Sequence, residues 1–462
     1  MKLEFHGADR QVTGSCHMIR CRDKTILVDC GMYQGGREMD EENRQDFGFN
    51  PREVDVLLLT HGHLDHCGRI PLLVKQGFRG KIVTTAATRE LARLVMLDSA
   101  RIQEEEANFK NKKLRKNGKK QDAVPLYTTL DALTCLDYFY DITAFNRSYD
   151  LGPDMKATFY DAGHILGAAS ILLELGENSC KKRILFSGDL GYSDRAILRD
   201  PAVPPHADIV VMETTYGNRM HKQLDPSIHE LYEAIDVTLE RGGNVLIPSF
   251  ALERTQEILY YLREGIGKGM VKENVQVFLD SPMAISATEI FQRHPECFDS
   301  ETWEIFKTGE DPFDLPGLHY SRDTAQSIAL KQVKGAVIIA GSGMATGGRI
   351  RHHLKHNLWR KEASVVFVGY AANGTLARRI IDGQNPVRIF GQEIDVRAQI
   401  YTIGGFSAHA DQHDLLQWHA RTGNPETTFL VHGEEEAMQT FAGLLTDTRV
   451  EMPKLHQVYE IR

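Results

Sequence analysis

A dense cluster of metal-binding side chains follows a short apolar run near residue 60, and it constrains the fold more than any other feature of the sequence. The apolar run, residues 54–60, is typical of a buried strand, and residues 67–74 are typical of the start of a helix. The cluster therefore lies in a strand-to-helix loop, where rigid elements direct side chains into one space. It contains four candidate metal ligands: His61, His63, Asp65 and His66.

The spacing of these four side chains suits two adjacent metal ions. Side chains alternate along an extended chain, so the first three point to one side, and His66 joins them as the chain turns into the helix. We expect His61 and His63 to bind one metal, and Asp65 and His66 to bind the other. Imidazole and carboxylate ligands together favour zinc, with manganese and iron as alternatives. The competing interpretation is a surface loop that is rich in histidine by chance.

Two residues near the cluster have two interpretations each. Asp29 ends an apolar strand-like run, and a carboxylate there could orient a ligating histidine through a hydrogen bond. An aspartate close to a glycine also forms turns, but the histidine cluster favours the orienting role. Cys67 is either a further ligand or a small buried filler, and we favour the filler. The seven cysteines are scattered without a C-x-x-C pair, which is typical of free thiols in a reducing compartment.

Three further apolar runs before residue 216 each lead to a side chain that can bind a metal or transfer a proton. A single such residue is explained by a capped strand end, but several at one sheet edge form a site. After about residue 395, two more runs end in the same way. The polar residues that follow these five runs are His164, Asp189, Glu213, His409 and His432.

A block of different character lies between these runs. From about residue 216 to 395, apolar strands alternate with helices, which predicts a parallel sheet covered on both faces. We therefore predict an α/β domain at 216–395 inserted into a first domain, which is formed by residues 1–215 and 396–462. A chain of 462 residues is long enough for two or three domains.

Composition excludes a membrane protein and leaves a nucleic-acid partner open. No apolar run approaches the ~20 residues of a membrane helix, and the N-terminus lacks the apolar region of a signal peptide, so we predict a cytoplasmic protein without a membrane partner. The net charge of −9 gives no global sign of nucleic-acid binding, although local patches and metals set the field at a site. One basic run, residues 110–120, follows a helix predicted from Thr88 to about Phe109. It is either an RNA-contacting arm or a solvated, mobile loop.

The H-x-H-x-D-H motif, with His164 and Asp189 downstream, resembles the metallo-β-lactamase superfamily. Glu213 in Glu-Thr-Thr-Tyr-Gly, His409 in Phe-Ser-Ala-His-Ala-Asp and His432 in Val-His-Gly-Glu resemble the three additional motifs of its β-CASP branch. The resemblance covers essentially the whole chain. Within this branch, the chain is similar to RNA nucleases such as the nuclease subunit of the cleavage and polyadenylation specificity factor. It implies an αββα sandwich that holds one or two metals, with the inserted block as the β-CASP domain.

The resemblance also assigns roles to the candidate residues. It implies two zinc ions, one held by His61, His63 and His164, the other by Asp65, His66 and His432, with Asp189 bridging them and Asp29 orienting a ligand. Two metals ~3.5–4 Å apart can share a hydroxide and clamp a phosphodiester. His409, poised by Glu213, would then protonate the leaving oxygen, and these two residues together with Asp65 and Asp189 are the predicted catalytic residues.

A glycine-rich turn in the inserted block is a candidate phosphate site. Glycines between Ala340 and Arg349 let backbone N–H groups converge at a helix N-terminus, although a tight strand-to-helix turn is an equally simple interpretation. The turn resembles a family segment that holds the RNA backbone. On that resemblance, we predict RNA phosphate contacts at Ser342, Gly343 and Arg349.

Three functional hypotheses compete. The first is a zinc-dependent RNA endonuclease that cuts single-stranded or structured RNA and leaves 5′-phosphate and 3′-hydroxyl ends, with a 5′-to-3′ exonuclease mode left open. His432 favours RNA, because DNA-acting members of the family usually carry valine at that motif. The second is a metallo-β-lactamase-fold hydrolase of small esters or thioesters. The third is a catalytically idle partner subunit, which the complete set of ligands disfavours. The sequence leaves a homodimer open.

Overall fold

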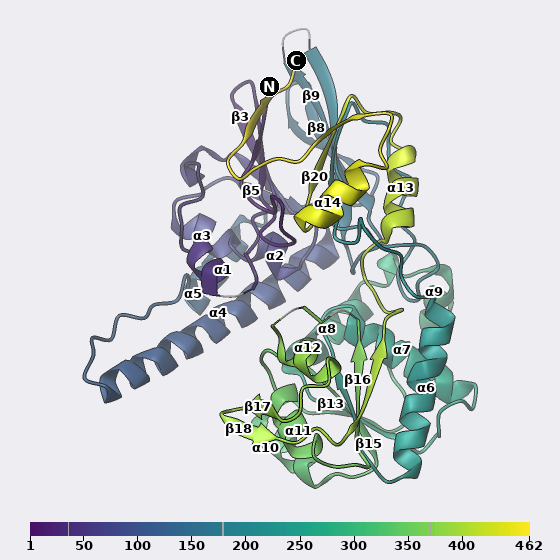
Figure 1. Cartoon of the computed structure of the whole chain (residues 1–462). Coiled ribbons are helices and arrows are strands. Elements are labelled where there is room, and N and C mark those ends of the chain that lie inside the picture. Colours follow the sequence, from purple (N-terminus) through teal and green to yellow (C-terminus); the bar gives the residue numbers. More distant parts are fainter. Residues whose placement is uncertain (36, 178–179, 370, 373) are drawn as a thin grey trace. The chain divides into compact units, whose positions relative to one another are not determined.

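The computed structural model describes residues 1–35, 37–177, 180–369, 371–372 and 374–462 (Figure 1). These residues form two compact units. The first unit comprises Met1–Asp194, Arg199–Met220 and His409–Arg462, and the second comprises Arg195–Leu198 and His221–Ala408. The second unit therefore interrupts the first unit in the sequence.

The first unit contains two seven-stranded sheets. One has the order β22-β1-β2-β3-β4-β5-β6, and the other has the order β21-β20-β11-β10-β9-β8-β7. The strands of the first sheet are β1 Lys2–Phe5, β2 His17–Cys21, β3 Lys24–Val28, β4 Val56–Leu58, β5 Lys81–Thr84, β6 Asp141–Ile142 and β22 Val458–Glu460. The strands of the second sheet are β7 Ser148–Gly152, β8 Met155–Asp161, β9 Ala169–Glu177, β10 Cys180–Phe186, β11 Ile209–Glu213, β20 Thr427–Val431 and β21 Arg449–Glu451.

Helices flank this pair of sheets and complete the predicted αββα sandwich (Figure 1). One core lies between the sheets, because each contributes alternate apolar side chains to it, such as Ile26 and Val28 from β3 and Ile171 and Leu173 from β9. The helices of this unit are α1 Arg37–Glu42, α2 Leu64–Cys67, α3 Ile70–Lys75, α4 Ala86–Lys116, α5 Thr129–Cys135, α13 Gln412–Ala420 and α14 Glu435–Ala442. Two short 3₁₀ turns lie at Pro51–Glu53 and Leu136–Tyr138.

The long helix α4 differs from the sequence prediction at both ends. Its N-cap is Thr85, whose side chain accepts a hydrogen bond from the backbone N–H of Thr88, so Thr88 lies inside the helix. The helix also continues to Lys116 through most of the basic run, which corrects the predicted end near Phe109 and the loop interpretation of residues 110–116. Lysine and arginine are good helix formers, and cations near a helix C-terminus are stabilised by its dipole.

The second unit is built on a six-stranded sheet with the order β14-β13-β15-β12-β16-β19, in which all neighbours are parallel. Its strands are β12 Val245–Pro248, β13 Gln276–Leu279, β14 Leu318–Tyr320, β15 Ala336–Ala340, β16 Ser364–Val368 and β19 Gln399–Ile403, with a separate hairpin of β17 Val387–Ile389 and β18 Gln392–Ile394. Its helices are α6 Leu224–Glu240, α7 Arg254–Gly267, α8 Pro282–Arg293, α9 Ser300–Lys307, α10 Thr324–Ala329, α11 Ile350–Asn357 and α12 Leu376–Ile381. Short 3₁₀ turns lie at Pro295–Cys297 and Leu330–Gln332.

This parallel sheet carries helices on both faces, as the alternating pattern predicts. Leu246 on β12 packs into one apolar cluster with Leu354 of α11 and Ala377 of α12. Helix α6 also contacts β12, β16 and β19. Strand β19 pairs with β16 in register over five residues, so residues 399–403 belong to this sheet, whereas the sequence division after residue 395 groups them with the first domain. Periodicity identifies a strand, but it does not identify the sheet that the strand joins.

Candidate metal centre and active site

The histidine cluster lies at the carboxyl end of a central strand. Strand β4 pairs in parallel with β3 and β5, and its buried residues lead directly into the loop that carries His61. Gly62 is required here, because a Cβ at this position would lie 2.8 Å from the Cβ of Leu91 on α4. His63 is the N-cap of the short helix α2, which turns Asp65 and His66 toward the same space.

The second sheet delivers its polar residues to the same edge. Strands β10, β11 and β20 are parallel neighbours, so their carboxyl ends lie side by side. Glu213 is the last residue of β11, and His432 directly follows β20. Asp189 follows β10, and His164 follows β8, which runs in the same direction as β10 because each pairs antiparallel with β9.

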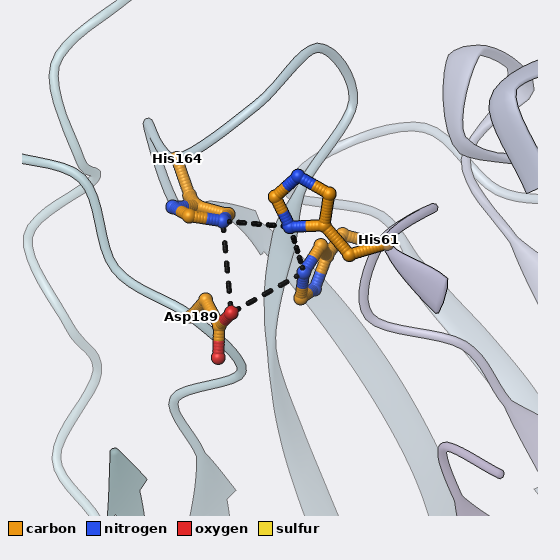
Figure 2. Close-up of side chains that lie close together, drawn as sticks. His61, His164 and Asp189 are labelled. Atoms are coloured by element: carbon orange, nitrogen blue, oxygen red, sulfur yellow. Dashed lines mark hydrogen bonds and ion pairs between the residues drawn. The ribbon is translucent and has the colours of Figure 1, made fainter. Parts of the chain in front are cut away.

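Three histidines and one carboxylate form the first group of candidate ligands. The Nδ1 atom of His63 lies 3.1 Å from the Nε2 atom of His61 and 3.1 Å from that of His164. Oδ2 of Asp189 lies 3.4 Å from Nε2 of His61 and 3.6 Å from Nε2 of His164. Figure 2 shows the rings of His61 and His164 directed at this carboxylate. One ligand atom from each of the four residues lies within 4.8 Å of every other.

Asp65, His66 and His432 form the second group. Nε2 of His66 lies 3.3 Å from Nε2 of His432, and Nε2 of His432 lies 3.5 Å from Oδ2 of Asp65. Oδ1 of Asp189 lies 3.2 Å from Nε2 of His66, whereas its other oxygen faces the first group. Asp189 therefore presents one oxygen to each group, and the two groups coincide with the predicted ligand sets.

The hydrogen bonds around the groups leave nitrogen lone pairs directed inward. The hydroxyl of Thr60 donates to Asp29 at 2.8 Å, so it accepts from Nδ1 of His61 at 3.1 Å. His66 donates from Nδ1 to Asp29 at 2.7 Å. In His61 the Nε2 atom then carries the lone pair, and in His66 Nε2 is the ring atom that faces Asp189. Oδ1 of Asp189 is buried and has no hydrogen-bond donor among the residues that the structure describes. A divalent cation would satisfy these atoms, and the residues therefore fit a metal centre.

Burial prepares several of these ligands for a metal. Desolvation lowers the pKa of His61 to about 3 and that of His63 to about 4, so both imidazoles are neutral at pH 7, as metal binding requires. Burial also opposes the charged form of His66, but the carboxylates of Asp189 and Asp29 outweigh it and raise the pKa of His66 well above its usual value. A metal at that position would displace a proton from His66.

The structure places Asp29 beside the ligands, behind His66. Its backbone adopts a φ of 61°, a left-handed conformation that aspartate and asparagine tolerate, and its Oδ1 accepts a hydrogen bond from the N–H of Thr60 at 2.8 Å. The same carboxylate therefore fixes both the loop and the ring orientation of His66. This geometry is the one that an orienting role needs, and the role itself remains a prediction.

His409 and Glu213 form a pair next to the ligand groups. Nδ1 of His409 lies 3.2 and 3.3 Å from the two carboxylate oxygens of Glu213, which is fully buried and also accepts from the N–H of Leu190 at 2.6 Å. The ring centroid of His409 lies 4.5 Å from that of His164. Burial opposes the imidazolium, but the charge of Glu213 and the hydrogen bond to it prevail and raise the pKa of His409 to about 9. A protonated imidazole beside a metal centre is a candidate general acid.

Comparison with known proteins identifies the family. The model of the metallo-β-lactamase superfamily matches residues 9–124, that of the β-CASP domain matches residues 255–380, and that of a Zn-dependent metallo-hydrolase RNA specificity domain matches residues 393–453. A ribonuclease of Thermus thermophilus is 39% identical over 96% of this chain and 96% of its own length. The chain belongs to the β-CASP branch of the metallo-β-lactamase superfamily. As a member, it is a metal-dependent hydrolase.

Other relatives of this β-CASP hydrolase extend the comparison. The transcription termination factor FttA of Methanocaldococcus jannaschii is 32% identical over 96% of this chain and 68% of the factor, and FttA of Methanosarcina mazei is 33% identical over 93% and 66%. A crystal structure of a protein of unknown function from Enterococcus faecalis V583 matches with a TM-score of 0.53 at 12% identity over 99% of both chains, which shows a shared fold. Across the described ranges, none of the helices combines the length and apolarity that crossing a bilayer requires.

The predicted RNA-phosphate residues of this β-CASP chain lie in the second unit. Ser342 Oγ lies 3.3 Å from Thr346 Oγ1 and accepts from the N–H of Gly347 at 3.3 Å. Gly343 packs against Phe250, and a Cβ there would lie 2.8 Å from its ring. Arg349 donates to Oδ1 of Asp280 at 2.8 Å, to the carbonyl oxygen of Ser321 at 2.8 Å and to that of Arg322 at 3.3 Å. The guanidinium of Arg349 is thus engaged within its own unit, and an RNA contact at this residue remains a prediction.

Two threonines beside the ligands have roles that the sequence patterns did not indicate. Thr60 fixes the tautomer of His61, and Thr215, whose hydroxyl lies 3.0 Å from Nδ1 of His432, can do the same for that ligand. Thr60 directly precedes His61, and Thr215 lies two residues after Glu213, which is the only signal the sequence offers. Cys67 is fully buried, its thiol donates to the carbonyl oxygen of Gly62 at 3.6 Å, and burial raises its pKa well above its usual value. These features favour a buried filler over a ligand.

Proposed function

We propose that the protein is a zinc-dependent RNA endonuclease that hydrolyses phosphodiester bonds and leaves 5′-phosphate and 3′-hydroxyl ends. One observation carries the proposal: two groups of ligands share the carboxylate of Asp189, and the His409–Glu213 pair lies against the same groups. A site of this kind suits hydrolysis of a phosphodiester, which needs charge stabilisation on one side and a proton for the leaving oxygen on the other.

The metals are proposed from the donor atoms. Three histidines and Asp189 would hold one ion, and Asp65, His66 and His432, again with Asp189, would hold the other. Five of these seven ligands are imidazoles, which favour zinc over manganese because manganese prefers oxygen ligands. When bound, two such ions would supply Lewis acidity and a nucleophilic water at neutral pH.

The residues of the chain would supply the rest of the chemistry. Glu213 holds the Nδ1 hydrogen of His409, which orients the ring and leaves Nε2 as the atom that transfers a proton. His409 would give that proton to the 3′-oxygen as the scissile bond breaks, because an alkoxide is a poor leaving group. Asp29 and Thr60 would keep the ligands in their metal-binding tautomers throughout.

RNA is proposed as the substrate because of the names of the relatives and because of His432. One relative is named a ribonuclease, and the matched C-terminal segment is described as an RNA specificity domain. A 5′-to-3′ exonuclease mode belongs to the same proposal as a variant. Cytoplasmic location and a homodimer remain predictions. Hydrolysis of small esters or thioesters is the alternative if nucleic acid is not cut.

The test is cleavage of a 5′-labelled single-stranded RNA and of the DNA strand of the same sequence. The zinc-loaded protein is compared with the same protein in chelator and with Asp189→Ala, which removes the shared ligand. Internal RNA cuts that disappear in both, with little DNA cutting, are expected. Stepwise release from the 5′ end would instead identify the exonuclease variant. Intact RNA after incubation with the zinc-loaded protein would overturn the proposal, and ester and thioester substrates would be screened next.

A further inference from the structure

Helix α4 extends far beyond what the first unit needs in order to cover its sheet. It contains 31 residues, which corresponds to about 45 Å at 1.5 Å per residue. In its first half, Leu91, Ala92, Val95 and Met96 are buried against the unit, whereas from residue 101 onward most side chains are exposed. Figure 1 shows the C-terminal half of α4 extending away from the two sheets of its unit, with the following segment returning beside it.

The returning segment, residues 117–127, fixes one face of this extension. The side chain of Asn111 donates to the carbonyl oxygen of Ala123 at 2.8 Å and accepts from its N–H at 3.1 Å. Gln103 accepts from the N–H of Leu126 at 3.1 Å, and the hydroxyl of the fully buried Tyr127 bonds to Ser99. The extension is therefore a built arm with a defined back, which a frayed helix end would not have.

The opposite face of the arm carries one continuous stripe. Phe109, Lys112, Lys113 and Lys116 are spaced three, four and seven residues apart, so their side chains project from one side of the helix. Phe109 is 71% exposed, and Ile102, one repeat earlier on the same side, is 44% exposed. An exposed aromatic ring is thus followed on the same face by three lysines.

The charge of the arm contrasts with that of the chain. Residues 110–120 contain seven basic residues and no acidic one, in a chain with a net charge of −9. Lys110 pairs with Glu106 at 3.8 Å. In the described part of the chain, the other six basic residues of this run have no carboxylate within ion-pair distance, whereas Arg101 near the base of the arm pairs with Asp98 and Glu105. The positive charge at the tip is available to an anionic partner.

The base of the same helix contacts the loops of the metal centre. Gly62, between two candidate ligands, packs on Leu91 of α4. The hydroxyls of Thr85 and Thr88 donate to the carbonyl oxygen of Gly167 at 2.7 and 2.8 Å, in the loop that follows His164. One rigid element of the first unit therefore connects the candidate active site to the basic stripe.

We propose that this stripe of α4 is a binding surface for single-stranded RNA, which contacts the strand at a distance from the scissile bond. The inference rests on the proposed function, because it takes RNA as the substrate of the centre. The three lysines would contact successive phosphates, and a base would stack on the exposed ring of Phe109. Charge complementarity favours a polyanionic strand, and the aromatic ring favours unpaired bases, whose faces are accessible.

The test is RNA affinity as a function of salt in the full-length chain. All proteins carry His409→Ala and are kept in chelator, so that the strand stays intact during the measurement. The arm variant is Lys112→Gln/Lys113→Gln/Lys116→Gln. The control, Lys2→Gln/Lys181→Gln/Lys454→Gln, removes the same charge from exposed lysines elsewhere in the same unit. Phe109→Ala, with Phe109→Trp as the conservative partner, tests stacking separately. The probe is a labelled, unstructured RNA strand.

The two kinds of contact predict different signatures. Each phosphate contact on a single strand contributes roughly 0.7 to the slope of log affinity against log salt, so the arm variant should lower the slope by about two, or roughly a hundredfold in affinity at 0.1 M salt. Phe109→Ala should weaken binding about tenfold without changing the slope, and Phe109→Trp should bind like the parent. The control should keep the slope of the parent.

Equal slopes and affinities in the parent, arm and control proteins would overturn the proposal and assign the stripe to a partner of other chemistry, such as an acidic protein. The result of this binding test can be distinguished from the result of the cleavage test of the proposed function. A wild-type protein that binds RNA through the arm but cuts none would overturn the proposed function and support the arm. Cleavage of RNA by a protein whose RNA affinity does not depend on the arm would support the proposed function and overturn the arm proposal.

Discussion

His409→Ala should slow RNA cleavage, because the alkoxide that leaves RNA needs a proton from this imidazole. His409 is one-fifth exposed and lies in a loop, so His409→Ala should leave the fold and both ligand groups in place. Burial opposes the imidazolium, but Glu213 outweighs it and raises the pKa of His409 to about 9, which favours the protonated form that a general acid needs. General acid catalysis typically contributes about 10²–10⁴-fold, or ~3–5 kcal/mol, and we expect kcat for RNA to fall within that range.

A pair of substrates isolates this proton transfer. RNA has an alkoxide leaving group, which needs protonation, whereas bis(p-nitrophenyl) phosphate releases a stable phenolate. His409→Ala should therefore lose far more activity toward RNA than toward the aryl ester, while its zinc content and affinity for RNA stay unchanged. His413→Ala is the matched control, because it removes an exposed histidine four residues away.

Equal loss of activity toward both substrates would refute this reasoning, since a residue that acts only on the leaving group cannot slow the reaction of a good leaving group. Unchanged RNA cleavage by His409→Ala would refute it as well. Loss of zinc in His409→Ala would show that the residue supports the ligands instead of donating a proton.

Three further predictions concern the metal centre and the second unit. Asp29→Asn should lower zinc affinity about 10–100-fold in a chelator competition, because the amide is a weaker acceptor for His66 while asparagine tolerates the positive φ. Asp280→Asn should destabilise the protein to denaturant by about 3–5 kcal/mol, since it leaves Arg349 and His353 without their buried carboxylate. Chelation should lower the melting temperature and zinc should restore it, because zinc at a thousandfold excess over Kd raises the free energy of unfolding by ~4 kcal/mol.

The stability that Asp280 contributes, and so the effect of Asp280→Asn, also depends on pH. Burial opposes its ionisation, but the hydrogen bonds from His353, Ser327 and Arg349 prevail and hold its pKa below the usual value. Its contribution to stability is therefore present above about pH 4 and is lost as the pH falls through the folded-state pKa. Asp280→Asn should lack that acid step. Unaltered zinc affinity in Asp29→Asn, wild-type stability in Asp280→Asn, or a melting temperature indifferent to zinc would contradict the respective prediction.

The location of the centre could be predicted from the sequence because its signals are local. Four ligands follow one strand within a few residues, and strand periodicity fixes their side. The remaining ligands each follow an apolar run, and parallel pairing of β10, β11 and β20 brings their ends to one edge. The αββα architecture and the family came from the resemblance and are confirmed. The roles assigned to individual residues remain predictions.

Features that depend on distant partners could not be predicted. Arg349 lies in a glycine-rich turn that suggests phosphate binding, yet its partner Asp280 directly follows strand β13, 69 residues earlier in the sequence. The basic run contains good helix formers but shows no apolar periodicity, so its pattern does not reveal the contact of Asn111 with the returning segment that supports α4. The sheet that β19 joins is likewise decided by pairing with β16, which a strand's own pattern does not encode.

The most direct measurement is a zinc titration of the metal-stripped protein that follows internal cleavage of single-stranded RNA. We expect no cleavage by the stripped protein and a return of activity that is complete at two equivalents of zinc per chain, with 5′-phosphate and 3′-hydroxyl ends on the products. Cleavage by the stripped protein at the full rate would contradict the metal-dependent mechanism. Intact RNA at saturating zinc would contradict the nuclease itself.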